Sequence, residues 1–424
     1  MAPIAIRIPP MPATTTLEPA RLEFSPLIIA LAGALTLSVA MGIGRFAFTP
    51  LMPMMLHDGV IDINGGSLLA TANYVGYLAG ALICMVLPSL FRRFGLAISN
   101  AAMVRFGLVS TVLLTLAMAF DLPVAWGSLR FLSGIISAFV FVFMSGWCLK
   151  RLAEMGASAL SGIIYTGPGI GITLSGVVAY GVTAANGSAA AGWIAFAVLA
   201  ALLSAVVWPV YRPDSVTNTA QKAAAATLGH AGDRWTIEQM ILALAYGLAG
   251  FGYIITATFL PVIAREALGP SGWIEAFWPV FGIGVAIGAV LTRVIPLSID
   301  RRLLLVLCYV VQAVGVVSAL VMPSVSGFMI GSTLVGLPFT VITLDGMQEA
   351  RRLRPVDATS FMALMTAAYG IGQIAGPPLA AAILAHSASH AIGFSLSLTV
   401  ASGSLVFGAV LYGVSMVVYP ARRG

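Results

Sequence analysis

The sequence predicts an all-α integral membrane protein, with twelve transmembrane helices arranged as two pseudo-symmetric six-helix bundles. Three observations lead to this prediction: the composition, the number of long apolar runs, and a repeat of the first half of the chain in the second. Of the 424 residues, 59% are hydrophobic and only 8% are charged. Soluble domains contain about 25% charged residues, so most of this chain is expected to lie in the membrane.

Twelve apolar runs follow one another, and each is long enough to cross a hydrocarbon layer about 30 Å thick as an α-helix. None of them has the two-residue alternation of a transmembrane β-strand. The expected helices cover residues 26–55, 66–90, 97–119, 124–148, 160–183, 189–211, 237–263, 273–297, 303–322, 326–348, 358–384 and 392–418.

The apolar runs divide the chain into five expected segments. Residues 1–25 are a flexible cytoplasmic tail, in which no charged stretch leads into a short apolar core, so no signal peptide is expected. Residues 26–211 form the N-terminal six-helix bundle, and residues 237–419 form the C-terminal one. The polar residues 212–236 between them form a cytoplasmic linker, and residues 420–424 are a second cytoplasmic tail.

The basic residues predict the orientation of the helices. When both termini are placed in the cytoplasm, sixteen of the 21 Lys and Arg residues fall in cytoplasmic segments, and Arg265 alone falls in an outer loop. This positive-inside pattern predicts a multi-pass membrane protein with both termini in the cytoplasm. The basic loops are short and adjoin apolar helices, so the net charge of +6 predicts contact with lipid headgroups and not with nucleic acid. The sixteen residues are Arg7, Arg21, Arg92, Arg93, Lys150, Arg151, Arg212, Lys222, Arg234, Arg301, Arg302, Arg351, Arg352, Arg354, Arg422 and Arg423.

The second half of the chain repeats the glycine spacing of the first half. At an offset of 208 residues, Gly76 and Gly80 correspond to Gly284 and Gly288. Such glycines let helices approach one another closely. Two six-helix halves that run in the same orientation place a pseudo-two-fold axis along the membrane normal. Further along the chain the offset falls to 201, where Gly169 and Gly171 correspond to Gly370 and Gly372.

Two stretches of the first half resemble sequence patterns of the major facilitator superfamily. Residues 130–138, Arg-Phe-Leu-Ser-Gly-Ile-Ile-Ser-Ala, are similar to its fourth-helix pattern, in which Gly and Ala follow an Arg at four-residue steps. Residues 162–171 resemble the Gly-Pro motif of its antiporters, although Ile172 stands where a second Gly is usual. The resemblance implies a twelve-helix transporter fold, with a cavity between the bundles.

Two further stretches refine this resemblance. Residues 91–95, Phe-Arg-Arg-Phe-Gly, are similar to the Asp-Arg-x-Gly-Arg signature of the superfamily but lack its Asp, whereas Asp300-Arg301-Arg302 in the second half keeps the acid. Residues 42–50, Gly-Ile-Gly-Arg-Phe-Ala-Phe-Thr-Pro, resemble the YbfB/YjiJ-type branch. The resemblance covers residues 26–418. It implies a protein of the bacterial cytoplasmic (inner) membrane, but it does not indicate a substrate.

Arg45 is the residue around which the functional prediction is built. It lies slightly beyond the middle of the first apolar run, and Tyr253 occupies the corresponding position in the second half. Gly42, Gly44 and Pro50 are expected to bend or loosen the helix beside it, which is tolerable only against protein or a wet cavity. A cation at this depth is costly, so a functional role is the default interpretation.

A carboxylate on another helix is the first candidate partner for Arg45. Asp345 and Glu275 are the only carboxylates expected inside the membrane, but the first lies toward the inner end and the second toward the outer end. We therefore predict a substrate anion as the partner of Arg45, with an internal ion pair as the alternative.

The resemblance implies that the first, fourth, seventh and tenth helices line the central cavity, flanked by the second, fifth, eighth and eleventh. Asn73 and Tyr77 share one helix face because they are four residues apart, and Tyr369 and Gln373 do so for the same reason. Aromatic walls with few polar groups are typical of a small-molecule site, although helix packing is the alternative for each aromatic residue. The predicted substrate-binding residues are Arg45, Asn73, Tyr77, Arg130, Tyr165, Tyr253, Trp278, Tyr369 and Gln373.

Three residues are candidates for proton coupling. Burial favours the neutral form of a carboxyl group, so Asp345 and Glu275 are the predicted proton carriers, and the superfamily pattern implies a role for Arg130. The alternative for Asp345 is an ion pair with Arg351 or Arg352 at the inner end of its helix. The alternative for Arg130 is a bond to the backbone of the first helix.

These residues favour a secondary active transporter that works by alternating access. The leading hypothesis is a proton-linked carrier of a small organic solute, anionic or zwitterionic. The alternative is proton-linked efflux of a drug-like compound, which the Gly167-Pro168 pair favours; that pair is otherwise a simple bend. No nucleotide-binding motif is present, so a gradient must supply the energy. The chain is expected to function as a monomer.

An enzymatic role is not expected. Residues 345–351 faintly resemble the opening of a membrane phosphotransferase motif, but they contain one residue too many and no acidic cluster follows. His386 and His390 have a spacing that can bind metal, but no third ligand lies near them in the sequence. The three cysteines stand alone. We therefore expect no cofactor and no metal.

Overall fold

The computed structural model describes residues 24–94, 99–212, 235–269, 272–292, 295, 299–354 and 358–420. Within these ranges it contains twelve helices that are long and apolar enough to cross a membrane, and no residue of these ranges lies in a strand. The predicted all-α membrane fold is therefore confirmed. Most of the predicted N-terminal tail and linker, and residues 421–424, lie outside the described residues.

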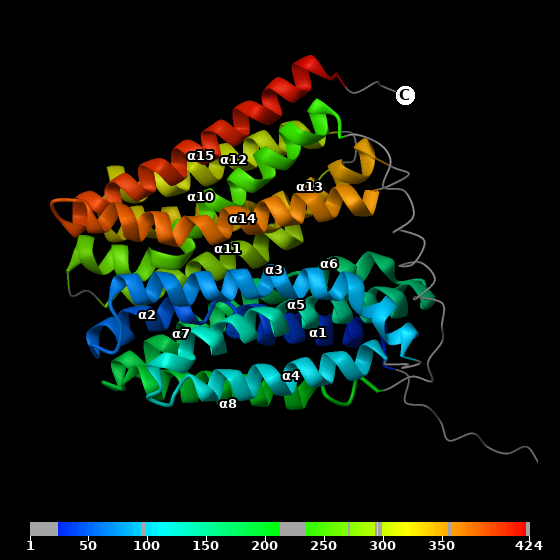
Figure 1. Cartoon of the computed structure of the whole chain (residues 1–424), viewed down its shortest axis with the longest axis horizontal. Helices are drawn as coiled ribbons and strands as arrows, with labels where there is room; N and C mark the ends of the chain where they lie inside the picture. Colours follow the sequence, from blue (N-terminus) through cyan, green and yellow to red (C-terminus); the bar gives the residue numbers. More distant parts are fainter. Residues whose placement is uncertain are drawn as a thin grey trace, which may run out of the picture.

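The first six spans form one bundle, drawn in blue to green in Figure 1. The elements are α1 (Pro26–Leu37), η1 (Ser38–Ile43), α2 (Phe48–His57), α3 (Ile63–Arg93), α4 (Asn100–Ala117), α5 (Pro123–Glu154), η2 (Ser158–Leu160), α6 (Ser161–Ile164), α7 (Gly167–Ala184) and α8 (Ala189–Val207). The first span is interrupted, whereas α3, α4, α5 and α8 are continuous. The fifth span consists of the short pieces η2 and α6, followed by α7.

The last six spans form the second bundle, drawn in green to red in Figure 1. The counterpart of the interrupted first span is here a single helix of 32 residues. The elements are α10 (Ile237–Leu268), η4 (Ile274–Ala276), α11 (Phe277–Leu291), α12 (Arg301–Val321), α13 (Val325–Leu353), α14 (Ala358–Ala385) and α15 (His390–Val418).

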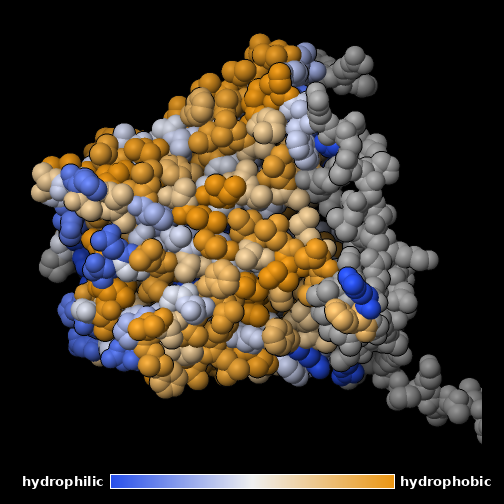
Figure 2. Space-filling view, viewed as in Figure 1, coloured by the Kyte–Doolittle hydropathy of each residue, from blue (hydrophilic) through white to orange (hydrophobic). Residues whose placement is uncertain are grey.

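Local sequence signals set where many of these helices begin. The side chains of Ser99 and Ser188 each accept a hydrogen bond from the backbone N–H three residues later, which satisfies one of the unpaired donors of a helix start. Thr236 and Gln239 form a reciprocal capping box at the start of α10. Between these starts the helices are apolar, and Figure 2 shows a broad hydrophobic surface between the two ends of the molecule.

The glycine repeat has a packing role in both bundles. A side chain on Gly76 or Gly80 would overlap with the backbone of α5 at Phe131 or Ile135. A side chain on Gly288 would likewise overlap with the backbone of α13 at Leu337. The glycines therefore let α3 approach α5, and α11 approach α13, at backbone contact.

The two bundles meet along a seam that is closed by hydrogen bonds. We call the end of the molecule that carries residues 24, 212, 235 and 420 the inner end, since the charge pattern predicts it to be cytoplasmic. Toward the other, outer end, Thr49 donates to the carbonyl of Ala257 (2.8 Å), and the hydroxyls of Tyr74 and Thr258 lie 3.1 Å apart. Both bonds join the first bundle to α10.

Candidate functional site

The site begins with the break in the first span. Residues 38–43 form a π-helix and residues 44–47 a turn before α2 starts. Gly42 lies so close to Gly171 of α7 that a side chain there would overlap with the backbone. Pro50 lacks the N–H that would bond to the carbonyl of Phe46 in a continuous helix. The structure thus places the break at the predicted glycines and proline, and such π-bulges are frequent at functional sites.

Arg130 of α5 bonds to the backbone of this break. Its side chain is only 2% exposed, and it donates from Nη1 to the carbonyl of Gly44 (3.2 Å) and from Nη2 to that of Arg45 (3.0 Å). Ser133 also donates to Gly44 (2.6 Å), and the Arg130 guanidinium lies 5.0 Å from the ring centre of Phe48. These donors satisfy carbonyls that lose their helical partners at the break. The structure therefore contains the backbone bond that was the alternative for Arg130.

Arg45 itself points into the seam. It is 3% exposed, and its Nη2 donates to Oε1 of Gln373 on α14 at 2.6 Å. The guanidinium carbon lies 3.9 Å from the ring centre of Tyr77, and 5.4 Å from those of Phe46 and Tyr74. Its Nε is buried without an acceptor. In the described part of the chain no carboxylate pairs with Arg45, and its bonded partner is a neutral amide.

Gln373 extends this contact into the second bundle. Its Nε2 donates a hydrogen bond to the hydroxyl of Tyr253 on α10. Tyr253 occupies the position that corresponds to Arg45 in the repeat. The chain Arg45–Gln373–Tyr253 therefore links the first span to two helices of the other bundle, through side chains that the sequence predicted for the site.

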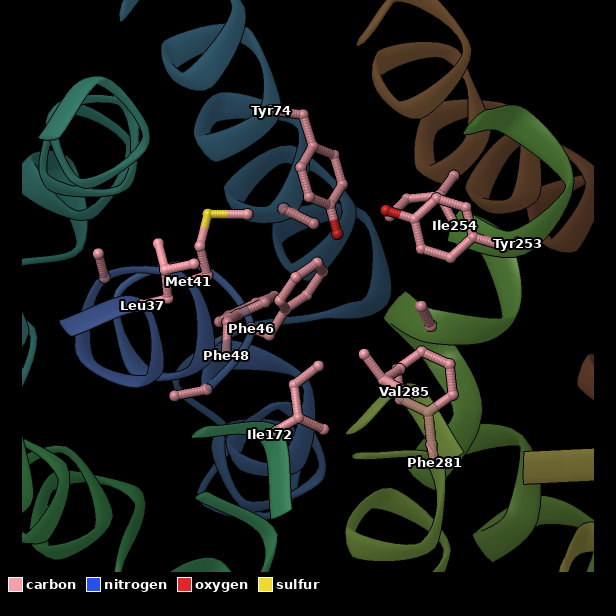
Figure 3. Packing of buried hydrophobic residues seen from close by; sticks show 14 of the residues in the cluster. Leu37, Met41, Phe46, Phe48, Tyr74, Ile172, Tyr253, Ile254, Phe281 and Val285 are labelled. Atoms are coloured by element: carbon pink, nitrogen blue, oxygen red, sulfur yellow. The ribbon is translucent and has the colours of Figure 1, made fainter. Parts of the chain in front are cut away.

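Aromatic rings from both bundles surround this chain. We call the connected set the aromatic band; neighbouring ring centres in it lie 4.9–6.4 Å apart. Figure 3 shows Tyr74 and Phe46 of the first bundle facing Tyr253 and Phe281 of the second. The aromatic band consists, in order of contact, of Tyr246, Tyr369, Tyr253, Phe339, Phe46, Trp278 and Phe281.

Three of the predicted substrate-binding residues have other contacts. Asn73 donates to the carbonyl of Arg130 (3.0 Å) and so joins α3 to α5. Trp278 is buried, and its Nε1 donates to Ser175 of α7 (3.3 Å), which closes the seam. Tyr165 packs its ring against Phe141 at 6.2 Å. The structure thus brings the predicted residues Arg45, Tyr77, Tyr253, Tyr369 and Gln373 together. Trp278 joins them through Phe46, and Arg130 through the carbonyl of Arg45.

The two predicted proton carriers are both ion-paired with arginines of their own bundle. Asp345 accepts from Arg301 at 2.9 Å, and Glu275 pairs with Arg265 at 3.3 Å. The alternative prediction, in which Asp345 forms an ion pair with Arg351 or Arg352, is wrong. Two helical turns separate Asp345 from Arg352, and Arg352 instead binds Glu349, three residues before it, at 2.9 Å.

A charged cluster that was not predicted lies at the inner end of the second bundle. Glu349 is 1% exposed, because α13 continues to Leu353 beyond the expected end at residue 348. Arg302, also buried, lies 3.7 Å from Glu349, 3.7 Å from Glu238 and 3.1 Å from Asp300. Asp345 and Glu275 are therefore not the only carboxylates within the spans. The basic pair Arg301-Arg302 after Asp300 was the signal that could have revealed this cluster.

Asp300 precedes α12 and is held by this cluster. Partial burial alone would raise the pKa of its carboxyl group, but hydrogen bonds from the side chain and backbone of Arg302 outweigh burial and hold the pKa below its ordinary value. Among the described residues, no group of three His, Cys, Asp or Glu side chains could hold a metal ion.

Comparison with known proteins agrees with this architecture. The family described as "Uncharacterised MFS-type transporter YbfB" matches residues 37–413. A crystal structure of a mutant of the nucleoside transporter NupG has the same fold, with a TM-score of 0.68 at 14% sequence identity, over 92% of this chain and 99% of that chain. A search of curated proteins found no match. The predicted resemblance is confirmed, and the chain belongs to the YbfB-type family of transporters in the major facilitator superfamily.

Proposed function

We propose that this chain is a secondary active transporter that moves a small organic anion by alternating access, and that Arg45 binds the anion. One observation carries the proposal: the guanidinium of Arg45 is buried in the seam between the bundles, and its hydrogen-bond acceptor is a neutral amide. A buried charge without a counter-ion is costly, so an anion that enters the seam gains a strong partner. In the proposal the chain is a monomer of the bacterial cytoplasmic membrane, with both termini in the cytoplasm.

The contacts across the seam support alternating access. The bonds Thr49–Ala257 and Tyr74–Thr258 each involve neutral groups. A neutral hydrogen bond contributes only about 0.5–1.5 kcal/mol net, so an anion bound at Arg45 can offset the loss of one or two of them. Because Gln373 belongs to the second bundle, an anion that replaces its amide oxygen also changes the link between the bundles.

Proton coupling is the second part of the proposal, with Asp345 and Glu275 as the proton carriers. Asp345 and Arg301 line a cavity of about 110 Å³ together with Thr292 and Gln348. This volume admits water, which supports access of protons to the carboxylate. Protonation would remove the charge that holds Arg301 and so change the contacts between α12 and α13.

Drug efflux remains the second candidate function, and the fifth span is the observation that favours it. This span is broken at residues 165–166, and α7 begins at Gly167-Pro168. The superfamily's antiporters carry such a Gly-Pro motif. In that case Arg45 would hold the bundles together through Gln373 and would bind no anion.

A ligand screen by thermal shift tests the proposal. A ligand that binds only the folded protein raises its Tm. We expect small carboxylates to raise the Tm of the wild-type protein in detergent, and to need about tenfold to a hundredfold higher concentrations for the same shift in Arg45→Gln. Nucleosides, which the name of NupG indicates as its cargo, serve as neutral comparison compounds. Stabilisation by cationic drugs in both proteins, with no effect of any carboxylate, would replace the proposal by drug efflux.

A further inference from the structure

We infer that the anion is a planar aromatic carboxylate. This inference rests on the proposed function, because it names the class of anion that Arg45 binds. It is carried by the surroundings of the guanidinium: three rings of the first bundle lie within 5.4 Å of it, and across the seam its partner Gln373 bonds to Tyr253 of the aromatic band.

The charge of the site selects a single negative group. Arg45 donates to a neutral oxygen of Gln373, and a carboxylate oxygen in that place would give the guanidinium its counter-ion. Inside the described helices no carboxylate pairs with Arg45, and the two acids first considered as its partners are occupied elsewhere: Asp345 pairs with Arg301, and Glu275 with Arg265. No acid is therefore left for the ammonium group of a zwitterion, and one arginine does not balance a doubly charged phosphate ester.

The walls of the site select a flat ring. Tyr77, Tyr369 and Phe339 are each partly exposed, whereas Tyr253 behind them is buried. Tyr253 stacks on Tyr369 at 5.8 Å and meets Phe339 edge-on at 5.0 Å, so these rings are fixed in orientation. Tyr77 covers one face of the Arg45 guanidinium at 3.9 Å. A carboxylate must approach in the guanidinium plane, and its ring then lies among the three partly exposed rings.

Aromatic rings prefer aromatic neighbours in stacked or edge-on geometry over aliphatic groups of the same size. Benzoate and cyclohexanecarboxylate carry the same charge and differ in the planarity and π-system of the ring. Benzamide keeps the ring of benzoate and removes the charge. These three probes therefore separate the contribution of the guanidinium from that of the aromatic band.

The experiment measures the Kd of the three probes for the full chain in detergent, by thermal shift over a concentration series. We expect benzoate to bind about tenfold more tightly than cyclohexanecarboxylate and benzamide not to bind. Tyr369→Leu should bring the two carboxylates to nearly equal affinity. Tyr180→Leu is the matched control: Tyr180 is exposed on α7, and its removal should leave the preference for benzoate unchanged.

The outcomes separate this inference from the proposed function. Equal affinity for both carboxylates, lost in Arg45→Gln, overturns the aromatic class and leaves the anion transporter standing. Equal affinity for benzoate and benzamide, or no binding of either carboxylate, overturns both. If Tyr369→Leu does not fold, Phe339→Leu replaces it with the same expected loss of preference.

Discussion

The first spans of the two bundles correspond in sequence but differ in structure. In the first bundle the span is interrupted at residues 38–47, whereas α10 runs without a break through Gly250 and Gly252, the counterparts of Gly42 and Gly44. The shared glycines therefore do not cause the break. At the position of Pro50 the second bundle has Thr258, whose backbone N–H can continue the helix. Close packing is also common to both glycines, since Gly42 abuts the backbone of α7 at Gly171 and Gly250 abuts that of α14 at Tyr369.

The corresponding helices α5 and α13 also differ, in the side chains that they direct toward the first span of their bundle. Gly134 of α5 abuts the backbone of Asn73 and Tyr77, and Gly336 of α13 abuts that of Phe281 and Val285, their counterparts at the offset of 208. This packing fixes an offset of 202 between α5 and α13. Arg130, Ser133 and Ser137 all donate to carbonyls of the first span. At that offset their counterparts are Ser332, Val335 and Phe339.

The break and its hydrogen-bond donors thus occur together in one bundle only. Arg45 lies in the turn that follows the π-helix, where Arg130 binds its carbonyl. The second bundle contributes neutral groups to the same place, namely Tyr253 and Gln373. The site is therefore built across the pseudo-two-fold axis from two unlike halves and is not duplicated in each half.

The largest expected effect tests whether the second bundle carries the proton while the first bundle supplies the charge that binds the substrate. Both proposed proton carriers lie in the second bundle. If Asp345 or Glu275 carries the proton, Asp345→Asn or Glu275→Gln should abolish pH-driven uptake in proteoliposomes, because neither replacement can exchange a proton. Counterflow exchange of substrate should continue, since it needs no net proton movement. Wild-type pH dependence in both variants would exclude these two acids.

The next prediction concerns the charge that only the first bundle has. Arg45→Gln removes one charge-assisted contact, worth about 1.5–3 kcal/mol, so carboxylate affinity should fall about tenfold to a hundredfold. Arg45→Lys should rescue only part of this loss, because Lys lacks the planar fork of Arg. The Kd from thermal shift measures both.

The control for Arg45 is the Tm of the ligand-free protein. A fall in Tm that matches the loss of affinity would make Arg45 a structural link to Gln373 and not a substrate ligand. Unchanged affinity in Arg45→Gln would remove the anionic substrate altogether.

Arg130→Met should have a smaller effect on binding and a clear effect on stability. It leaves the carbonyl of Arg45 without its donor, at a cost of about 1–3 kcal/mol, whereas Gly44 keeps Ser133. We expect a lower Tm and carboxylate affinity reduced by up to about tenfold, because the turn that holds Arg45 loosens. Ser332→Ala, at the corresponding position of the uninterrupted half, is the matched control and should change neither quantity. An unchanged Tm in Arg130→Met would contradict the role of these hydrogen bonds.

The sequence predicted the twelve spans and the repeat well, because hydropathy and glycine spacing are local properties. It also nominated Arg45, Tyr253 and Gln373 for one site, and the structure joins these three side chains by hydrogen bonds. It did not predict that Arg45 and Gln373, 328 residues apart, bond directly. The partner of Asp345 was missed for the same reason, since Arg301 belongs to another helix. Such pairings depend on the rotation of each helix about its axis, which hydropathy does not determine.

The smallest expected effect concerns the inner ends of the two bundles. Asp300 in the second bundle corresponds to Arg92 in the first, and its partly exposed ion pair with Arg302 is worth roughly 0.5–1 kcal/mol. Because the pKa of Asp300 is lower in the folded protein than its ordinary value of 3.8, its stabilisation is present above that pH and is lost as the pH falls below it. Asp300→Asn should therefore lower the Tm slightly at pH 7, and the difference from wild type should vanish toward pH 3. Glu154→Gln is the control at the same end. Glu154 is exposed, and its ion pairs with Lys150 (3.7 Å) and Arg151 (3.5 Å) are exposed too, so its replacement should leave the Tm nearly unchanged throughout. A difference between wild type and Asp300→Asn that persisted at pH 3 would show that the Asn side chain disturbs the start of α12 sterically, and that the charge of Asp300 does not stabilise the second bundle.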